Sequence, residues 1–450
     1  MTEVAMQAPS ATTEHDLEAL LGDVLREAKA QGASAAEAAI STGAGLSVTV
    51  RLGEVETVEF TRDKGMGITV YFGQRKGSAS TSDFSKAALR DSVLAACHIA
   101  KFTAADDCNG LADAALMARA IPDLDLHHPW TLTVEQAIDL ARRCEATALT
   151  HDPRIRNSEG ATLDSHSSRR VYGNSHGFVG GYPSTRHSIS CSVIAEHDDE
   201  MQRDYWYDTA RDSRDLAAVE QVGRLAAERA VSRLQARKLS TRQAPVLFSA
   251  DIARGLWSSF IGAISGSRLY RRASFLVDSL GEQLYPESIT IFEQPHLRKA
   301  LGSAPFDSEG VATKDREIIR AGVLQGYVLD SYSARKLGMQ TTGNAGGVHN
   351  LGISHGELDL AGLIKHMHQG LLVTELMGHG INTVTGDYSR GAAGFWVEGG
   401  TIQYPVEEIT IAGNLREMFR NIVAVGRDTD CRGNIRTGSV LLGHMTIAGD

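Results

Sequence analysis

Histidine and glutamate side chains that could bind a metal ion are concentrated between residues 366 and 379. They are His366, His368, Glu375 and His379. A catalytic zinc ion takes three such ligands and keeps a fourth position for a water molecule that it activates. On a helix the first two histidines lie about 200° apart, and along a strand the glutamate and the last histidine are roughly 13 Å apart. A helix would allow the glutamate and the last histidine to bind one ion, but flanking glycines disfavour that helix. We therefore expect surface histidines here.

A polar, glycine-rich segment at 385–391 follows these residues. Its side chains could form a local turn, in which the aspartate bonds to the backbone and the arginine pairs with a carboxylate. Turn chemistry accounts for every residue of the segment. The functional alternative is a loop that lines a peptide-binding cleft, with Asp387, Tyr388 and Arg390 as the side chains that contact the substrate.

Other catalytic patterns are absent from the sequence. No histidine is followed by glutamate, so there is no HExxH motif, and there is neither a Walker A motif nor a GxSxG nucleophile elbow. The five cysteines are odd in number, widely spaced and form no CxxC pair, which argues against a disulfide framework and a structural zinc site. They are Cys97, Cys108, Cys144, Cys191 and Cys431.

The composition is that of a globular protein with an acidic balance. The chain has 450 residues, 42% of them hydrophobic, with 45 basic against 55 acidic residues and a net charge of −10. Nucleic-acid binding is disfavoured because it needs clustered basic residues. No apolar run is long enough for a membrane helix, and the N-terminus lacks the features of a signal peptide. The expected location is the cytoplasm, without a membrane partner.

The first half of the chain alternates between helix and strand patterns. We expect residues 1–12 to be disordered and helices at 14–31, 85–101, 133–149 and 215–236, with Thr13 and Thr133 as N-caps. Period-two alternation predicts antiparallel strands between the first two helices and again at 155–210. The order of helix, meander and helix thus occurs twice. We interpret this as a possible internal duplication, with halves at 13–110 and 120–236.

One strand in this region carries three consecutive aromatic residues. Alternation would place Tyr205 and Tyr207 on one face and Trp206 on the other, where they could pack in a core or at an interface.

After residue 236 the chain becomes richer in glycine and in short apolar runs. Residues 245–248 begin a strand, 250–264 predict a helix, and most of the rest predicts strands and long loops. We therefore place a domain boundary near 236–243, with an N-terminal α+β domain at 13–236 and a strand-rich C-terminal domain at 237–450. Segregated helices and antiparallel meanders indicate an α+β fold rather than a doubly wound sheet.

Several stretches, taken in order, resemble the TldD/PmbA family, and the match extends nearly from end to end. They are Gly53–Glu56, Gly67–Tyr71, Gly173–Gly177, Pro305–Gly310, Ser331–Gly338 and the block 366–415. Within the last block, the run from Gly386 to Trp396 is similar to the PmbA branch, which is also called TldE.

The resemblance implies a metal-dependent protease built from two paralogous chains. The TldD-type chain carries a His-Glu-x-x-x-His helix, with a cysteine near its C-terminus as the third metal ligand. The corresponding helix here is 249–265, and its motif positions fall at Ser258, Ser259 and Ala263. Cys431 lies near the position of the family's cysteine. The resemblance therefore implies that this chain has no catalytic, cofactor-binding or metal-binding residues, and that zinc is bound by a TldD-type partner.

The family's activity suggests what such a pair would do. It is a cytoplasmic protease that acts on unfolded peptides and proteins, linked to maturation of a peptide antibiotic, removal of an antitoxin and modulation of gyrase inhibition. The substrate would enter as an extended strand, because main-chain hydrogen bonds tolerate many sequences. Without its partner the chain could form a homodimer. The alternatives are a peptide-binding or regulatory protein that has no protease partner, and a self-sufficient metal hydrolase that uses the histidines of 366–379.

Overall fold

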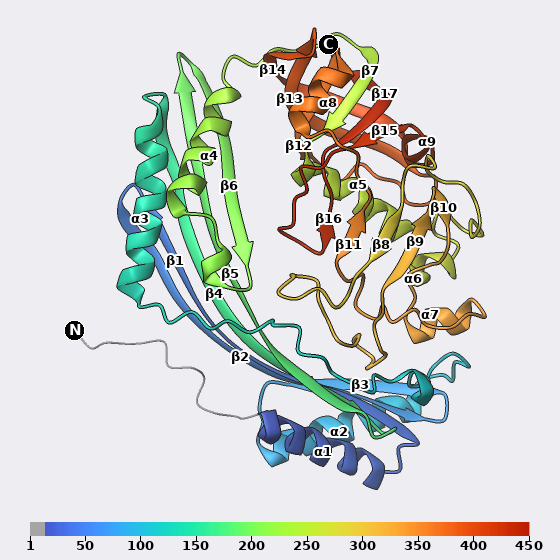
Figure 1. The fold of residues 1–450 in the computed structure, drawn as a ribbon. Helices are drawn as coiled ribbons and strands as arrows, with labels where there is room; N and C mark the ends of the chain where they lie inside the picture. The colour runs from blue at the N-terminus through green and yellow to red at the C-terminus, as the bar shows by residue number, and fades with distance from the viewer. Residues whose placement is uncertain (1–13, 450) are drawn as a thin grey trace.

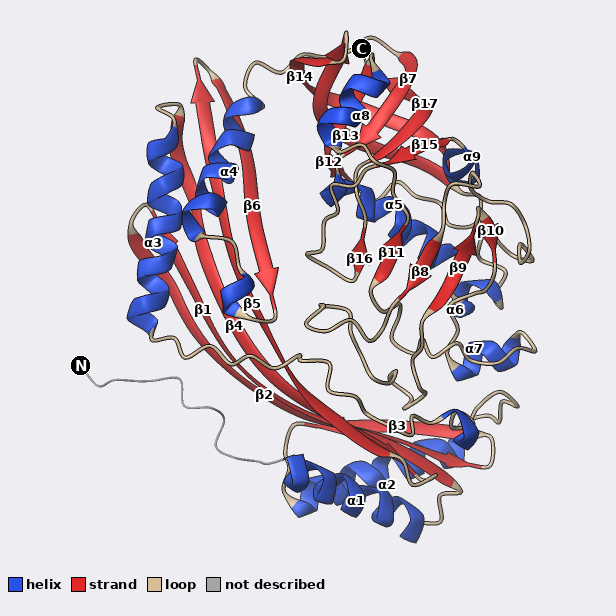
Figure 2. Ribbon diagram, viewed as in Figure 1, coloured by secondary structure: helices blue, strands red, loops and turns tan. Residues whose placement is uncertain are grey.

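The computed structural model describes residues 14–449, so the predictions for residues 1–12 and for the N-cap Thr13 lie outside it. A long curved β-sheet with its helices forms the N-terminal part, and the C-terminal part lies against the inner side of the curve (Figure 1). The chain combines helices with mainly antiparallel sheets (Figure 2), which confirms the predicted α+β fold. None of the helices within residues 14–449 is long and apolar enough to cross a membrane.

The N-terminal sheet has six antiparallel strands in the order β3-β2-β1-β4-β5-β6. Their bounds are β1 Ala35–Arg51, β2 Glu54–Phe72, β3 Arg75–Thr81, β4 Ile155–Asn174, β5 Val179–His197 and β6 Glu200–Ala210. The meanders are confirmed, but clear period-two alternation in β1 begins only at Leu46, well after the strand itself begins at Ala35. Its first half, rich in alanine and serine, has a weak pattern, and pairing with β2 and β4 on both sides makes it a strand.

Four helices accompany this sheet, close to the predicted positions. They are α1 Glu14–Ala30, α2 Lys86–Phe102, α3 Val134–His151 and α4 Val219–Ser232. Thr133 caps α3 as predicted, in a capping box with Gln136. The helix α4 begins later than expected because Ser213–Asp215 forms a separate 3₁₀ turn, capped by the side chain of Asp212.

All four helices pack on the same face of the sheet. Ala38 and Ile40 of β1 contact the core formed with α1 and α2, and Val48 and Val50, which point the same way, contact the core formed with α3 and α4. We call this the helix face. The opposite inner face, which includes Ala39, packs against Phe306 of the C-terminal part.

The two halves of the sheet have the same order of elements. Helix, three strands and helix run from α1 to α2 and again from α3 to α4, and the first strands of the two halves, β1 and β4, pair at the centre. This topology is what an internal duplication would produce. The duplication itself stays a prediction.

Two close approaches fix the helices on the sheet. The β1–β2 turn places Leu52 and Gly53 at positive φ (51° and 80°), and the buried carboxylate of Glu145 on α3 accepts hydrogen bonds from both backbone N–H groups at 2.8 and 2.9 Å. At Gly223 on α4, a Cβ atom would lie 2.0 Å from the carbonyl oxygen of Cys144 on α3, so only glycine allows this helix contact.

The C-terminal part contains two further sheets. One has the order β14-β13-β12-β7-β17-β15 and closes on itself through β14–β17 pairing, and the other has the order β10-β9-β8-β11-β16. The strands are β7 Arg242–Phe248, β8 Ile291–Glu293, β9 Arg316–Arg320, β10 Val323–Leu324, β11 Leu351–Ile353, β12 Gly370–Met377, β13 Asp387–Glu398, β14 Thr401–Asn414, β15 Ile422–Val425, β16 Ile435–Arg436 and β17 Val440–Ala448. The helices are α5 Ala250–Ala263, α6 Gly266–Leu269, α7 Ser331–Lys336, α8 Leu360–Met367 and α9 Leu415–Arg420.

The helix α5 lies between these two sheets. It contacts β12 of one and β16 of the other, and its residues Leu256, Trp257 and Phe260 belong to the large apolar core that the two sheets share. The predicted strand at 245–248 and the predicted helix at 250–264 are both confirmed as β7 and α5.

Candidate functional site

The helix α5 carries the positions at which the resemblance would place metal ligands. Ser258 is exposed, the hydroxyl of Ser259 donates to the carbonyl of Gly255 at 2.8 Å, and Ala263 is fully buried. None of these side chains is a zinc ligand of the kind that the family motif uses. The residues present therefore do not fit a catalytic zinc ion, and no chemistry can be assigned to such an ion on this helix.

The loop that contains Cys431 packs against the same helix. The Nη1 atom of Arg254 donates to the carbonyl of Arg432 at 3.4 Å, and the indole N–H of Trp257 donates to the hydroxyl of Thr437 at 2.8 Å. Cys431 itself is exposed, and its sulfur accepts a hydrogen bond from Arg436 at 3.5 Å. The fold thus brings the cysteine loop to α5, as the resemblance implies, but without histidine ligands at the three motif positions of α5.

The contact between β6 and α5 joins the two parts of the chain through charged side chains. Asp204 of β6 is nearly fully buried and pairs with Arg229 at 3.2 Å and with Arg233 at 3.5 Å, both on or next to α4. Arg229 also lies 3.8 Å from Asp251 of α5, and Arg233 pairs with Glu375 of β12. The two arginines therefore link the N-terminal sheet to the C-terminal part.

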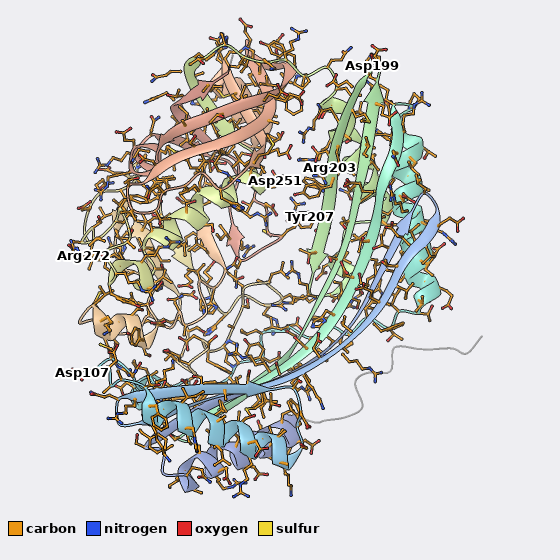
Figure 3. All side chains as sticks on the ribbon, turned by 180° about the vertical axis from the view of Figure 1, so that it is seen from behind. Asp107, Asp199, Arg203, Tyr207, Asp251 and Arg272 are labelled. Atoms are coloured by element: carbon orange, nitrogen blue, oxygen red, sulfur yellow. The ribbon has the colours of Figure 1, made fainter. Side chains whose placement is uncertain are left out.

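The aromatic residues of β6 complete this contact. Tyr205 and Tyr207 stack on the inner face with ring centroids 6.3 Å apart, and Trp206 packs on the helix face, so the predicted alternation is confirmed. The guanidinium of Arg432 lies over the rings of Trp206 and Tyr207, and Arg254 donates to the Tyr207 hydroxyl at 2.8 Å. Figure 3 shows Tyr207, Arg203 and Asp251 where the strand faces the C-terminal part.

Sequence reasoning missed this network, although a signal was present. Arg229 and Arg233 are spaced to lie on one side of a helix, and Asp204 shares its strand face with Trp206, so the sequence places an acid beside a large apolar side chain. A carboxylate at such a position needs a cation.

The three cleft candidates lie at the start of β13. Asp387 is exposed, and its Oδ2 atom accepts a hydrogen bond from the Thr385 hydroxyl at 2.5 Å, so it bonds locally but to a side chain rather than to the backbone. The expected pairing of Arg390 with a carboxylate is not found among residues 14–449. Tyr388 is buried, and burial raises its pKa to about 12 while the charge of Arg390 opposes the shift. The structure places Tyr388 and Arg390 on one face of the strand and Asp387 on the other.

The histidines of 366–379 are dispersed. His366 and His368 are exposed at the end of α8, Glu375 pairs with Arg233, and His379 is exposed beyond the end of β12. Among residues 14–449, no group of three or more histidine, cysteine, aspartate or glutamate side chains is arranged to hold a metal ion.

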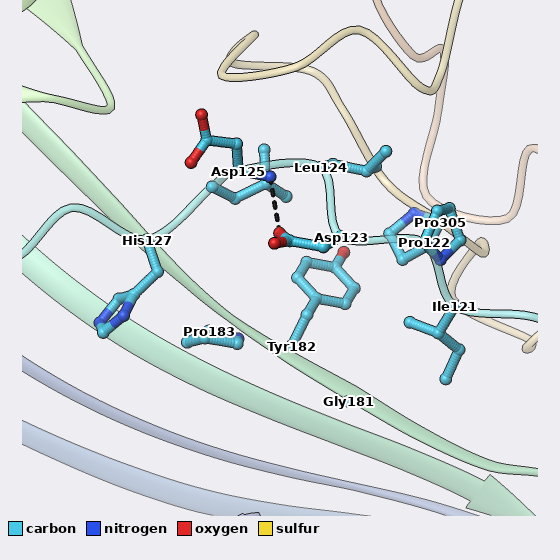
Figure 4. Close-up of a pocket in the computed structure, with 11 residues that line it drawn as sticks. Ile121, Pro122, Asp123, Leu124, Asp125, His127, Gly181, Tyr182, Pro183 and Pro305 are labelled. Atoms are coloured by element: carbon cyan, nitrogen blue, oxygen red, sulfur yellow. Dashed lines mark hydrogen bonds between the residues drawn. The ribbon is translucent and has the colours of Figure 1, made fainter.

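A pocket of about 410 Å³ lies between β5 and the segment that connects the two halves (Figure 4). Asp123, Asp125, His127 and Tyr182 are the polar side chains of its wall. Asp123 accepts a hydrogen bond from the backbone of Asp125 at 2.9 Å, and Asp125 pairs with Arg298 at 3.3 Å. Burial lowers the pKa of His127. Both carboxylates already have hydrogen-bond or ion-pair partners. The side chains of the pocket wall are therefore not arranged for catalysis.

A second group of polar side chains lies where the inner face meets the C-terminal part, and the charge of Glu309 contributes to the raised pKa of Tyr71 and Tyr172. The carboxylate of Glu37 accepts hydrogen bonds from the hydroxyls of Tyr71 and Tyr172, each at 2.9 Å. Burial, and then the charge of Glu37, raise the pKa of both tyrosines. Glu309 of the C-terminal part accepts a hydrogen bond from the backbone of Ser331 at 3.0 Å, and burial raises its pKa to about 7.

The raised pKa of Glu309 predicts a pH-dependent stability. A carboxyl whose pKa is raised on folding favours the folded state below its unfolded value, and this contribution is lost as pH rises through about 7. The variant Glu309→Gln has no such group. We expect its free energy of unfolding in urea to match the wild type at pH 5 and to exceed it by about 1–2 kcal/mol at pH 8. The exposed control Glu59→Gln should show no pH-dependent difference from the wild type. Unfolding curves of Glu309→Gln that coincide with those of the wild type at both pH values would contradict the prediction.

Serine–histidine pairs do not supply a nucleophile either. Ser165 lies 3.0 Å from His187, but both are almost completely buried in the helix-face side of the sheet. Ser167 lies 3.2 Å from His127, whose neighbours are the pocket residues described above. We find no site of this chain with the arrangement of a complete catalytic centre among the residues described.

Comparison with known proteins assigns the chain to a family. Three family models match in order: PmbA/TldA metallopeptidase domain 1 at residues 36–100, the central domain at 127–234 and the C-terminal domain at 241–449. The metalloprotease PmbA of Escherichia coli O157:H7 is 54% identical, over 92% of both chains. A PmbA homologue of Haemophilus influenzae is 51% identical over 97% of both chains.

More distant relatives match as well. A TldD homologue, also from Haemophilus influenzae, is 24% identical over 83% of this chain and 81% of its own length. The crystal structure of a candidate modulator of DNA gyrase from Bacteroides thetaiotaomicron superimposes with a TM-score of 0.93 at 28% identity, covering 98% of this chain and 100% of that one. The matches extend over nearly the whole length, as the sequence resemblance predicted, and the chain belongs to the PmbA/TldD family of metallopeptidases.

Proposed function

We propose that this chain is the non-catalytic, PmbA/TldE-type subunit of a heterodimeric zinc protease that acts on unfolded polypeptides in the cytoplasm. One observation carries the proposal: α5 has Ser258, Ser259 and Ala263 where the TldD-type motif has its two histidines and its glutamate. The partner is a TldD-type paralogue that supplies the zinc ion. Haemophilus influenzae has both a PmbA homologue and a TldD homologue, which supports a pair of paralogues.

The substrates of the pair are extended chains, such as an antitoxin or the precursor of a peptide antibiotic. The inner face of the N-terminal sheet supports this choice, because it presents short polar side chains rather than a deep apolar pocket. Ser188, Ser190 and Ser192 follow one another on this face of β5 and are partly exposed. Serine hydroxyls can donate hydrogen bonds to, and accept them from, the backbone of an extended peptide whatever its side chains are.

Mixing the two chains tests the proposal. Casein hydrolysis would be measured for this chain alone, for its TldD-type paralogue alone and for an equimolar mixture, with zinc determined by elemental analysis. We expect activity only in the mixture, removal of that activity by a chelator, and zinc that follows the paralogue. Stoichiometric zinc and chelator-sensitive activity in this chain alone would instead support the self-sufficient hydrolase. Tight casein binding with no activity in any mixture would support a peptide-binding protein.

A further inference from the structure

Two buried hydrogen-bond donors near the start of β13 have no partner. The hydroxyl of Tyr388 is inaccessible, the whole residue is 3% exposed, and the Nε atom of Arg390 is likewise inaccessible. Neither atom has a hydrogen-bond partner among the described residues, and no described carboxylate pairs with the guanidinium. Nearly all buried polar groups in proteins are hydrogen-bonded, so two neighbouring exceptions require an explanation.

The two donors are close to one another. They are two positions apart on β13 and therefore point to the same side of the strand, where they lie opposite Gly413 and Ile411 of β14. Their side is the apolar core of the C-terminal part, to which Tyr388 and Ile411 both belong. The charge of Arg390 also reaches the Tyr388 hydroxyl, since it lowers the pKa that burial raises.

The acidic residue nearest to Arg390 in the sequence does not neutralise the arginine. Asp387 lies on the opposite side of the strand, where its oxygens accept hydrogen bonds from Thr385 at 2.5 Å and from Asn414 at 3.3 Å. A partly buried arginine normally pairs with a carboxylate through two parallel hydrogen bonds. A structural role for Tyr388 and Arg390 alone would not explain why both donors lack an acceptor.

We propose that Tyr388 and Arg390 form a subsite that binds a carboxylate group of the polypeptide substrate. The Arg390 guanidinium and the Tyr388 hydroxyl would both donate hydrogen bonds to the carboxylate oxygens. The ligand would approach from the side where Arg390 is partly exposed. This inference rests on the proposed function for the identity of the ligand as a peptide. The carboxylate could belong to the C-terminus of the peptide or to an aspartate or glutamate side chain.

Peptide binding by the full-length chain tests the subsite directly. The probes are fluorescein-labelled peptides of one neutral, extended sequence in three forms: a free C-terminal acid, a C-terminal amide, and an amide with one internal glutamate. Fluorescence anisotropy would give Kd for each. We expect at least one of the two acidic peptides to bind roughly tenfold more tightly than the neutral amide. Whichever acidic form shows the preference identifies the source of the carboxylate.

Variants separate this role from a structural one. In Arg390→Gln the preference for the acidic peptide should disappear, and in Arg390→Lys part of it should remain because the charge is kept. Tyr388→Phe should weaken the preference several-fold, yet its melting temperature should equal or exceed that of the wild type, because the hydroxyl that is removed has no partner. Arg62→Gln, an exposed residue of β2 with the same loss of charge, is the control and should bind like the wild type.

Each result of these binding measurements either supports or overturns the carboxylate subsite. Equal affinity for all three peptides in the wild type would overturn the subsite, as would an undiminished preference in Arg390→Gln. A lower melting temperature together with unchanged binding in Tyr388→Phe would show that the hydroxyl is structural. The protease assay is independent of these measurements. A preference for acidic peptides without activity in the mixture would reject the proposed protease and retain the subsite.

Discussion

Replacing Trp257 by alanine is expected to destabilise the chain by about 3–5 kcal/mol, the usual cost of truncating a large buried aromatic side chain. The side chain is completely buried at the centre of the C-terminal core. Its ring lies 5.8 Å from that of Tyr285, and its indole N–H donates to Thr437 in the loop region that follows Cys431. The substitution therefore removes the apolar contact of α5 with both sheets and the hydrogen bond that anchors the loop.

Urea denaturation followed by circular dichroism would measure the effect. Trp257→Phe serves as the matched variant, because it retains most of the buried aromatic surface and loses the hydrogen bond; its cost should be about 1–2 kcal/mol. The exposed α5 variant Ser258→Ala should change stability by less than about 0.5 kcal/mol. If Trp257→Ala unfolds at the same urea concentration as Ser258→Ala, α5 is not the centre of this core.

Replacing Asp204 by alanine is expected to cost about 3 kcal/mol and to loosen the contact between the two parts of the chain. Removing one member of a buried ion pair weakens the compensation of the charge that remains, and here both Arg229 and Arg233 lose an acidic partner. Both arginines retain a second acid, Asp251 and Glu375 respectively, so the loss should stay near the lower end of the range for broken buried pairs.

The connection between α4 and β7 offers a second measurement. We expect limited proteolysis to cut residues 233–241 of Asp204→Ala several-fold faster than those of the wild type, because the paired side chains hold β6 and α4 against the C-terminal part. Asp199→Ala is the control: this aspartate is exposed at the β5–β6 turn, visible at the end of the strands in Figure 3. Equal cleavage of the two variants would mean that other contacts hold the two parts together.

The local elements of the fold could be predicted because their signals are local. The stripe of Leu17, Leu21 and Val24 predicts α1, and these side chains are all buried in the core beneath the first half of the sheet. The capping box at Thr133 and the alternating run from Tyr205 to Tyr207 are likewise present. Hydrophobic periodicity and helix capping depend only on residues that are close in the sequence, so they can be recognised from the sequence alone.

The pairing of distant strands could not be predicted in this way. The strands β1 and β4 pair at the centre of the sheet, with Glu37 opposite Asn174. The residue pattern of either strand does not indicate which strand it pairs with. The same holds for the closure of the C-terminal sheet, where Thr410 pairs with Ala448. The alanine-rich start of β1 has a weak pattern of its own and is a strand because of its partners.

The candidate site shows the same difference between features that depend on local sequence and features that depend on distant residues. The expectation that the histidines of 366–379 are surface residues followed from spacing, which is a local property, and all three are exposed. The Asp204 network was missed because Asp204, Arg229 and Asp251 come from three different elements, β6, α4 and α5. That Tyr388 and Arg390 lack acceptors depends on everything that surrounds them, and only the packed structure contains this information.

The pairing of β17 with β7, β14 and β15 has a consequence for synthesis on the ribosome. β7 opens the C-terminal part at Arg242, but the sheet closes only when Val440–Ala448 has been made. The N-terminal sheet and its two cores have all their strands by Ala210 and can fold during elongation. The C-terminal sheet, in contrast, cannot be completed until β17 has been synthesised, and until then the edges of β7 and β14 remain unpaired. Unpaired strand edges promote aggregation. We expect ribosome-bound chains that end before β17 to require chaperones, and pulse proteolysis of stalled chains would reveal the late closure.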